Sequence, residues 1–552
     1  MALLALVSIA VLAVGYLSYG RLIARQYRLD DARATPAATV NDGVDFVPTP
    51  RFYLLGQHFS AISAAGPIAG PILACQVFGW APSILWIVIG VVLIGAVHDF
   101  SALVASVRHR AASVAEVIKE HVGTRAWIAT MIFIWIALVY VLVAFVDVTA
   151  NTFVGRTTDL PGHVPFNRGG AVAAASAMYL GLSIAMGLVQ RLLKPPLWLV
   201  TVIFVPATLA AVWAGTMVST RLVFPAPVWS ATILGYCFVA ALLPVWLLLQ
   251  PRGYLGGFVL YVALGAGVVG VLFSGAEIAQ PAFRGWSGPG PTGALFPFLF
   301  VTIACGACSG FHGLVCSGTT SKQIAREADC KPVGYGGMLL EAFVAIIALS
   351  TIVMVAPDDV AGRGPGRIYG DGLGRFLAIV VGERNLVFAQ TFGAMAFSTF
   401  VFDTIDVATR LGRYILQELT GLRGRIGMVA ATALTIVPPA VVLWANPATP
   451  GEPPPYMRFW TLFGSANQLL AALTLMGVTV WLRREGRRTW FVLLPMLFVL
   501  TITVWSLVVQ AIRTEDAMLR ITAVALLALA GFVGFESLRA GARPVASVPA
   551  AG

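Results

Sequence analysis

Long apolar runs recur along the whole chain and are separated by short polar loops. A run of about 18 or more apolar residues predicts a helix that crosses a membrane, because a helix of that length spans the hydrocarbon core. We therefore predict an all-α fold, a polytopic membrane helix bundle of about 15 spans. The predicted spans are 2–22, 52–79, 81–106, 126–150, 171–190, 196–218, 228–249, 254–275, 295–318, 334–355, 386–408, 426–446, 457–482, 489–511 and 520–538.

The run 52–79 is interrupted near its centre by Gly66-Pro67 and Gly70-Pro71. Proline removes a backbone donor and clashes with the preceding turn, and glycine weakens a helix further. Backbone groups freed in lipid must be satisfied by protein or by a water-filled cavity. We predict a helix that is broken twice at mid-depth, which is a feature of transporters that bind a substrate or ion there.

A second apolar run, 295–324, is also interrupted. Its glycines are Gly306, Gly310, Gly313 and Gly318. Its polar side chains are those of Ser309, His312, Ser317, Thr319 and Thr320. Two interrupted helices in one chain predict a binding site between them, here between 64–72 and 305–319. Close helix packing is the alternative reading of the glycines, but it does not explain the adjacent prolines and hydroxyl groups.

The composition supports a membrane protein and argues against nucleic-acid binding. The chain is 58% hydrophobic and 11% charged, and its mean hydropathy is +0.86. Soluble domains carry about 25% charged residues. The net charge of +11 comes from arginines in short loops rather than from a continuous basic stripe.

The basic residues predict the orientation of the chain. If odd-numbered spans run from outside to inside, 25 of the 36 Lys and Arg residues fall in inside loops. This bias predicts an outside N-terminus and an inside C-terminus. The run 2–22 lacks a basic start and a clear cleavage site, so we interpret it as a retained first helix. We interpret the longest hydrophilic stretches, roughly 25–51, 151–170 and 356–385, as loops.

Ionisable side chains inside the spans are functional candidates, because a charge in lipid is costly. The candidates for proton coupling are His58, Asp99, His312, Glu341 and Asp403. Histidine suits this role because its ordinary pKa lies near neutral pH. Two carboxylates have simpler alternatives: Asp99 could pair with Arg108 or Arg110, and Asp147 could be solvated at the end of its span.

One helical face of the span near 400 carries several charges. They are Asp403, Asp406, Arg410 and Arg413. The i,i+4 spacing of Asp406 and Arg410 predicts a structural ion pair, and a charge relay is the alternative. Farther along, the buried amides of Asn467 and Gln468 either tie helices together or line a site, because buried amides need partners.

Four potential metal ligands share one face if the second interrupted helix is continuous. They are Cys305, Cys308, His312 and Cys316. Zinc sites usually draw ligands from loops and pairs of elements rather than from one helical strip. We interpret the cysteines as small buried side chains and predict no metal, no cofactor and no catalytic residue.

Several long motifs resemble one known family. They are His58-Phe59 followed by GPIAGP, VHDF at 97–100, PFLFVTIACGACSGFHGLVCSGTTSKQI at 297–324, FDTIDVATRLGRYILQEL at 402–419 and FGSANQLLAAL at 463–473. They closely resemble the carbon starvation protein A (CstA) family, over about residues 50–480. The resemblance implies a bacterial inner-membrane transporter of peptides or, in some relatives, of pyruvate taken up with protons. It also implies a LeuT-like inverted-repeat architecture.

Together these observations predict a secondary active transporter that imports short peptides or a small keto acid such as pyruvate during nutrient limitation. The coupling ion is the proton, with sodium as the alternative. An N-terminal transmembrane region, 1–355, contains both broken helices, and a C-terminal region covers 356–552. A channel and a membrane-embedded enzyme are the alternative classes. The sequence contains no Gly-rich phosphate loop of the kind that would indicate ATP-driven transport.

The partners of the chain would be a small-molecule substrate and membrane lipid. Half-helix N–H groups would hold the substrate carboxylate, and nearby hydroxyl groups would add hydrogen bonds. The predicted substrate-binding residues are Gly66, Pro67, Gly70, Ser309, Thr319, Thr320 and Asn467.

Overall fold

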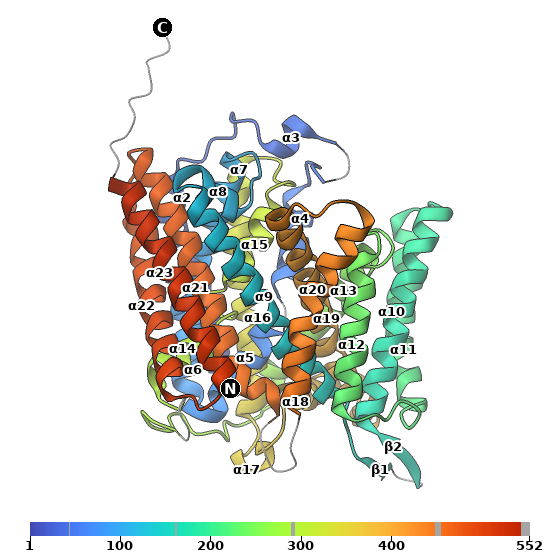
Figure 1. The fold of residues 1–552 in the computed structure, drawn as a ribbon. Helices are drawn as coiled ribbons and strands as arrows, with labels where there is room; N and C mark the ends of the chain where they lie inside the picture. The colour runs from blue at the N-terminus through green and yellow to red at the C-terminus, as the bar shows by residue number, and fades with distance from the viewer. Residues whose placement is uncertain (43–44, 64, 161–162, 289–292, 448–453, 543–552) are drawn as a thin grey trace.

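The computed structural model describes residues 1–552 except 43–44, 64, 161–162, 289–292, 448–453 and 543–552. In this part of the chain the helices stand side by side as a bundle, with a small β-hairpin at one end (Figure 1). The hairpin pairs β1 (Thr157–Leu160) antiparallel with β2 (Val164–Asn167). The predicted helical bundle is confirmed.

Among the described residues, 12 helical segments are long and apolar enough to cross a membrane. They are α1 (Ala2–Leu17) with α2 (Tyr19–Tyr27); α6 (Trp80–Gly90), η1 (Val91–Gly95) and α7 (Ala96–Arg108); α9 (Thr124–Thr152); α10 (Arg168–Leu192); α11 (Leu197–Met217); α13 (Leu249–Phe273); η3 (Glu327–Asp329), η4 (Lys331–Tyr335) and α16 (Gly336–Val353); η5 (Glu383–Asn385) with α19 (Leu386–Thr420); α20 (Gly424–Ala445); α21 (Pro455–Arg484); α22 (Trp490–Arg513); and α23 (Ala517–Ala542).

The interrupted spans are built from shorter helices. The first consists of α4 (Arg51–Ile62) and α5 (Gly66–Phe78), and the second of α14 (Leu295–Thr302), α15 (Gly310–Val315) and the π-helical turn η2 (Cys316–Thr320). The pair α4 and α5 is bent by 47° and raises the number of spans to 13. The two other predicted spans fall on α12 (Ala226–Leu242) and on α14–η2. Every predicted span therefore coincides with helix, while the division at residue 355 stays a prediction.

The stretch 356–385, which we interpreted as a loop, is largely helical. It contains α17 (Pro357–Val360) and α18 (Pro365–Val381). Glycines at every fourth position of α18 allow it to pack closely on α19: a Cβ on Gly370 would lie 2.8 Å from the Cβ of Ala394. Arg367 and Arg375 of α18 are exposed, so the mean polarity of the stretch hid its apolar face. The remaining short helices are α3 (Pro36–Val40) and α8 (Val114–His121).

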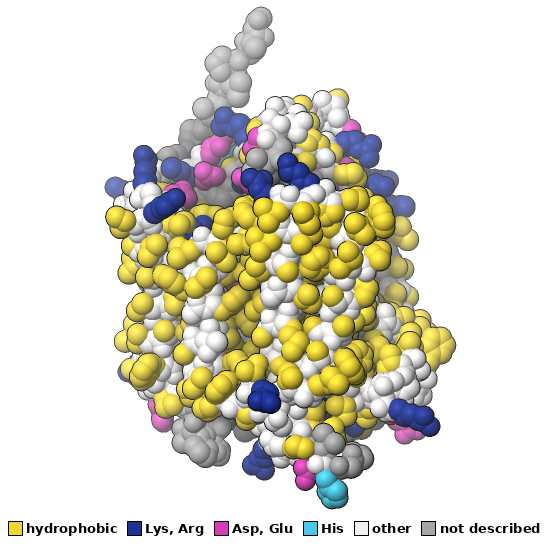
Figure 2. Space-filling model, turned by 90° about the vertical axis from the view of Figure 1, so that its right-hand side faces the viewer, with side chains coloured by type: hydrophobic (Ala, Val, Ile, Leu, Met, Phe, Trp, Pro, Cys, Tyr) yellow, Lys and Arg dark blue, Asp and Glu magenta, His cyan; other side chains and the backbone are white. Residues whose placement is uncertain are grey.

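Hydrogen bonds between helix ends show which ends lie together. Arg487, just after α21, donates to the carbonyl of Tyr27 at the end of α2. Arg484 donates to the carbonyl of Ala540 near the end of α23. These helix ends share the end of the bundle that carries α3 and α8, which we call the α8 end, whereas the chain starts at the opposite end (Figure 1). Figure 2 shows a broad hydrophobic band between charged rims, as a membrane-embedded surface requires.

We expect Gly370→Val to destabilise the protein, because the added side chain must displace Ala394 of α19. Overpacking of this kind costs about 1–3 kcal/mol. The measurement is the midpoint of thermal unfolding of the detergent-solubilised protein. Gly235→Val on α12 is the matched control, since no atom lies within 4 Å of the added Cβ. Equal midpoints for the two variants would contradict the close packing of α18 on α19.

Candidate functional site

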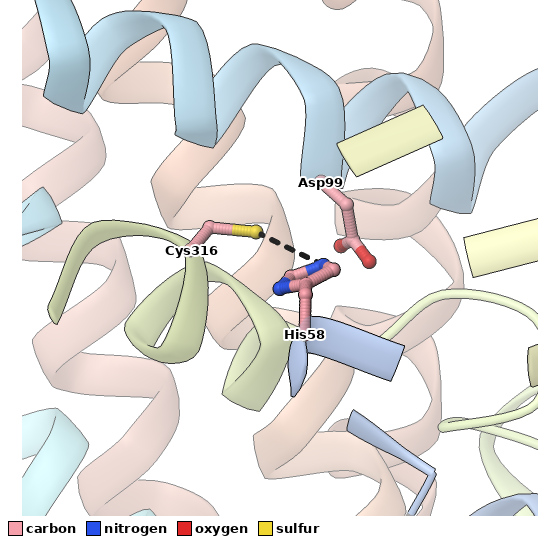
Figure 3. A group of neighbouring side chains, drawn as sticks. All are labelled: His58, Asp99 and Cys316. Carbon is pink, nitrogen blue, oxygen red and sulfur yellow. Dashed lines mark hydrogen bonds between the residues drawn. The ribbon is translucent and has the colours of Figure 1, made fainter. Parts of the chain in front are cut away.

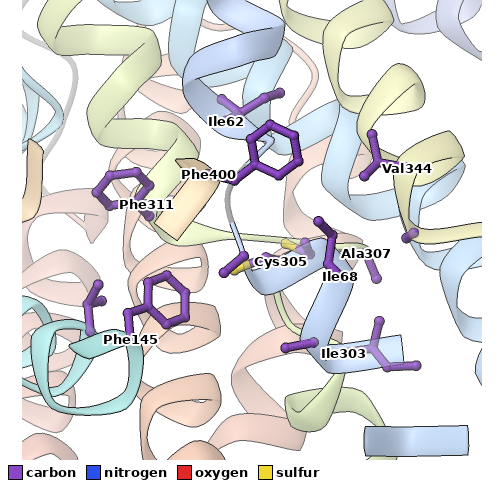
Figure 4. Packing of buried hydrophobic residues seen from close by; sticks show 14 of the residues in the cluster. Ile62, Ile68, Phe145, Ile303, Cys305, Ala307, Phe311, Val344 and Phe400 are labelled. Carbon is purple, nitrogen blue, oxygen red and sulfur yellow. The ribbon is translucent and has the colours of Figure 1, made fainter. Parts of the chain in front are cut away.

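The two helix breaks lie directly against each other. A Cβ on Gly66 would lie 2.4 Å from Sγ of Cys305, and a Cβ on Gly70 would lie 2.7 Å from the carbonyl oxygen of Thr302. Only glycine permits this approach, because any side chain would push the segments apart. Figure 4 shows buried apolar side chains from both broken helices and their neighbours packed around this contact. The predicted juxtaposition of the two segments is present, although residue 64 lies outside the described residues.

The first break has a simpler form than we predicted. The chain leaves the helix after Ile62 and re-enters it at Gly66, so Pro67 stands in the first turn of α5. Proline is favoured in a first turn, where its missing N–H costs nothing. Gly70 and Pro71 lie inside α5 and do not break it a second time. The prediction of two breaks in this span is wrong, because neighbouring helices support a proline inside a membrane helix.

At the second break, side chains bind the carbonyl groups that the end of α14 leaves free. Gln468 donates to Phe300 at 2.9 Å, Trp460 to Thr302 at 3.1 Å and Trp86 to Ile303 at 3.3 Å. All three donors come from other helices. Such partners are obligatory at membrane depth, because an unsatisfied backbone group there costs several kcal/mol. The sequence had singled out only Gln468 among these donors.

The side chain of Asn467, on α21, bonds to the start of α15, the second half-helix. Its Oδ1 accepts the N–H of Phe311 at 2.9 Å, and its Nδ2 donates to Oγ of Ser309 at 3.0 Å and to Sγ of Cys305 at 3.3 Å. The amide therefore uses an N–H group that we expected to face a substrate carboxylate. The sequence left open whether the buried amides tie helices together or line a site. In the structure, Asn467 and Gln468 tie helices together.

A chain of buried ionisable groups lies directly beside the breaks. Nδ1 of His98 lies 2.7 Å from Oδ1 of Asp99, whose Oδ2 lies 2.9 Å from Nδ1 of His312. The other ring nitrogen of His312 lies 3.3 Å from Oε2 of Glu341. All four side chains are buried. They come from α7, α15 and α16, so the fold brings together residues that are far apart in sequence.

His58 joins this group from the last turns of α4, as Figure 3 shows. Its Nδ1 lies 2.9 Å from Oγ1 of Thr320, and its Nε2 lies 4.0 Å from Sγ of Cys316. The ligand atoms of His58, Asp99 and Cys316 lie within 4.8 Å of one another. We call His58, His98, Asp99, His312 and Glu341 the buried histidine cluster. Four of the five predicted coupling residues belong to it.

The fifth coupling candidate, Asp403, lies in a separate group of charges. Arg252 on α13 is fully buried, and its Nε donates to Asp403 at 2.8 Å. Its Nη1 donates to Asp406 and, at 2.6 Å, to Oη of Tyr236. We call these four residues the Arg252 cluster. The predicted spans 228–249 and 254–275 leave Arg252 in the loop between them, and only its position beside the second apolar run hints at burial.

The predicted ion pair of Asp406 and Arg410 is absent among the described contacts. Asp406 pairs with Arg252, and Arg410 instead donates to the carbonyls of Ala240 and Leu243 at the end of α12. The prediction is wrong because Arg410 reaches a helix C-terminus, where free carbonyls and the helix dipole favour a cation.

The simpler alternatives for two carboxylates also differ from the structure. Arg108 does not pair with Asp99 but donates through Nε to Glu327 at 2.7 Å. Asp147 is buried rather than solvated, and its Oδ2 accepts the N–H of Tyr456 at 2.8 Å. Tyr456 stands in the first turn of α21, where a carboxylate binds the free N–H groups of the helix.

Two further sequence interpretations differ from the structure: the helical strip of potential metal ligands, which required a continuous second helix, and the substrate-binding role of Thr319. Cys305 and Cys308 precede α15, so they do not share a helical face with His312 and Cys316. Thr319 is exposed and donates to the carbonyl of Val315, four residues before it. Thr319 therefore points away from the buried groups that surround Thr320.

The chain is similar in sequence to one family of known proteins. A family model described as "Carbon starvation protein CstA" matches residues 1–362 and 355–506. The chain belongs to the CstA family. Together with its membrane-length helices, this makes it a multi-pass membrane protein.

Relatives within the CstA family carry two kinds of name. The "Peptide transporter CstA" of Helicobacter pylori (strain ATCC 700392 / 26695) is 33% identical over 93% of this chain and 82% of that protein. The "Pyruvate/proton symporter BtsT" of Escherichia coli (strain K12) is 32% identical over 93% of this chain and 82% of that protein. Both names describe transporters, but they differ in substrate.

Solved structures resemble the chain more distantly. A manganese transporter of Eremococcus coleocola, in complex with an aromatic bis-isothiourea substituted compound, has a TM-score of 0.46 and 14% identity, covering 91% of this chain and 99% of that one. MhsT in complex with L-phenylalanine has a TM-score of 0.45 and 13% identity, covering 88% and 98%. The inverted-repeat architecture stays a prediction.

We expect Asn467→Ala to destabilise the second break, because it leaves the buried N–H of Phe311 without a partner. The loss is about 1–3 kcal/mol, the cost of an unsatisfied buried donor. The measurement is thermal unfolding of the purified protein. Asn446→Ala is the control, since among the described residues the side chain of Asn446, at the end of α20, donates to the carbonyl of Val442, one turn before it. An unfolding midpoint for Asn467→Ala equal to that of the control would rule out the holding role.

Proposed function

We propose that the chain is a proton-coupled secondary active transporter that imports a short peptide or a small keto acid such as pyruvate. The names of its CstA relatives support the transport class and both substrates. The structure adds one observation that carries the coupling role: the ring of His312 lies between the carboxylates of Asp99 and Glu341, deep inside the bundle.

The contacts of His312 favour an extra proton. A neutral imidazole has one N–H group and one bare nitrogen, and a carboxylate only accepts hydrogen bonds. Both ring nitrogens of His312 face carboxyl oxygens, at 2.9 and 3.3 Å. Either the ring is an imidazolium, or one of the two carboxyl groups carries the proton. The trio therefore holds a proton that can pass among three named groups.

The position of the cluster explains how proton occupancy could affect transport. His58 lies in α4 just before the first break, and His312 lies in α15 just after the second. Asp99 and Glu341, which contact His312, belong to the unbroken part of the bundle, on α7 and α16. A movement of either half-helix changes distances within the cluster and hence its affinity for the proton. A substrate that favours one arrangement of the half-helices is then linked to proton binding.

The substrate contacts follow from the same breaks. Gly66, Pro67 and Gly70 form the surface of α5 that meets the second break, Ser309 lies at that break, and Thr320 contacts His58 of α4. The proposal keeps these residues as the substrate region, with Asn467 holding its shape. Transport, rather than a catalysed reaction, is the class to which the named relatives belong.

We expect Glu341→Gln to abolish proton-driven accumulation while substrate exchange persists. The amide removes a proton acceptor from the trio but keeps its shape. The experiment uses proteoliposomes with an inward proton gradient and labelled pyruvate or a labelled dipeptide, and we expect at least about a tenfold fall in accumulation, typical of losing a proton-transfer group. Exchange at equal pH requires no net proton movement and reports that the variant is folded.

Glu536→Gln on α23 is the matched control, because the ion pair of Glu536 within the described part of the chain is with Arg539, near the end of the same helix. Accumulation by Glu341→Gln in proportion to the proton gradient would refute the coupling role of the trio. Accumulation that follows a sodium gradient instead would identify sodium as the coupling ion. The substrate that drives exchange in the wild-type protein decides between the peptide and the keto acid.

The proposal also includes location and orientation: a bacterial inner membrane, with the N-terminus outside and the α8 end inside. The distribution of Lys and Arg supports this orientation. A green fluorescent protein fused after the last residue should therefore fluoresce, and alkaline phosphatase fused at the same point should be inactive. An active phosphatase fusion would reverse the orientation without affecting the coupling argument.

A further inference from the structure

Two histidines at the α8 end, His109 and His121, approach each other closely through their ring nitrogens. Nε2 of His109 lies 2.7 Å from Nε2 of His121. The connection between α7 and α8 creates this approach, because Arg110 and Ala111 both adopt a left-handed backbone with φ near 60°. This tight turn leads into the Ser113 capping box that starts α8. The pair is half-buried and lies outside the buried histidine cluster.

The hydrogen bonds of His109 prepare one nitrogen as a ligand. Its Nδ1 lies 2.6 Å from the carbonyl oxygen of Ala105, and a carbonyl can only accept. Nδ1 therefore carries the hydrogen, and Nε2 of the neutral ring presents a bare lone pair to His121. A histidine that binds a metal through one nitrogen usually donates the other N–H to a carbonyl or carboxylate in this way.

A carboxylate completes the group. The ligand atoms of His109, His121 and Glu120 lie within 4.8 Å of one another. Glu485 and Arg484 also lie close enough to His121 to influence its charge. Glu485 is engaged elsewhere: its Oε1 accepts from Trp481 at 2.7 Å and its Oε2 pairs with Arg487. Glu120 is exposed and therefore able to turn its carboxylate toward the two rings.

We propose that His109, His121 and Glu120 form a binding site for a divalent transition-metal ion of the zinc class. Two imidazoles and one carboxylate suit zinc, with water as the fourth ligand of an open tetrahedral site. Tetrahedral ligands at zinc–nitrogen distances of about 2.0–2.1 Å stand on the order of 3.3 Å apart. The rings must separate by only a few tenths of an ångström to admit the ion, and His121 then carries its hydrogen on Nδ1.

Metal binding would fasten the end of α7 to α8. The ring of His109 also packs edge-on against Trp481 of α21, at 5.1 Å between centroids. A bound ion thus restrains a junction of three helices at the α8 end. Because an ion that binds only the folded state stabilises it by mass action, zinc should raise the midpoint of thermal unfolding.

The test is calorimetric titration of the purified full-length protein, carrying no polyhistidine tag, with zinc chloride. We expect one zinc ion per chain, and a rise in the unfolding midpoint that magnesium does not produce. His121→Asn should weaken binding at least about 100-fold, and Glu120→Gln about tenfold, in line with the effects of altered metal coordination. His163→Asn on the loop between β1 and β2 also removes one histidine and should bind like the wild type.

The second variant, at the exposed Glu120, keeps the test valid if His121→Asn proves unstable. Unchanged zinc affinity in both variants would overturn the proposal. Loss of binding in Cys316→Ser together with retained binding in His121→Asn would also overturn it, because the ion would then occupy the group of His58, Asp99 and Cys316.

Discussion

Residues 303–309 pass through the middle of the bundle outside any regular helix, so their polar groups that lack a helical hydrogen bond must be satisfied by the rest of the protein. Side chains from other helices satisfy several of these polar groups. Trp86, Trp460 and Gln468 bind the carbonyls that α14 leaves free, and Asn467 binds the N–H of Phe311 at the start of α15. Three of these four donors and acceptors lie on α21, which makes that helix the main support of the break.

The support of the break also explains the glycines that face it. Gly66 and Gly70 let α5 approach the second break so closely that a methyl group would not fit. The two interrupted helices are thereby held together at the depth where their hydrogen-bond ladders are missing. At the second break of this protein, several backbone groups bond to side chains on other helices instead of standing open to a ligand.

The buried charges obey the same rule of internal satisfaction and separate into two groups. In the buried histidine cluster, Asp99 contacts His98 and His312, and His312 also contacts Glu341. In the Arg252 cluster, one guanidinium lies between two carboxylates. A fixed cation holds the second group, because arginine does not lose its proton in proteins. The first group contains only side chains that can exchange protons, which is why the proposed coupling rests on it.

The sequence by itself determined the helical membrane fold and the location of both interruptions, and it singled out as candidates four of the five residues of the buried histidine cluster. These features follow from hydropathy, from the local effect of Gly and Pro, and from the cost of ionisable groups in lipid. The same local signals failed for α18, whose close glycine contacts with α19 are invisible in its mean polarity. They failed again for Asp406, whose partner Arg252 lies on another helix.

Only the tertiary structure decided which side chains meet. A spacing of i,i+4 made Arg410 the obvious partner of Asp406, yet a guanidinium from α13 and carbonyls from α12 took the two positions. Likewise, nothing local assigns Trp86 to the carbonyl of Ile303 or His312 to Glu341. Hydropathy and backbone propensity are properties of a short stretch of chain, whereas a buried polar contact depends on helices that packing brings together from distant parts of the sequence.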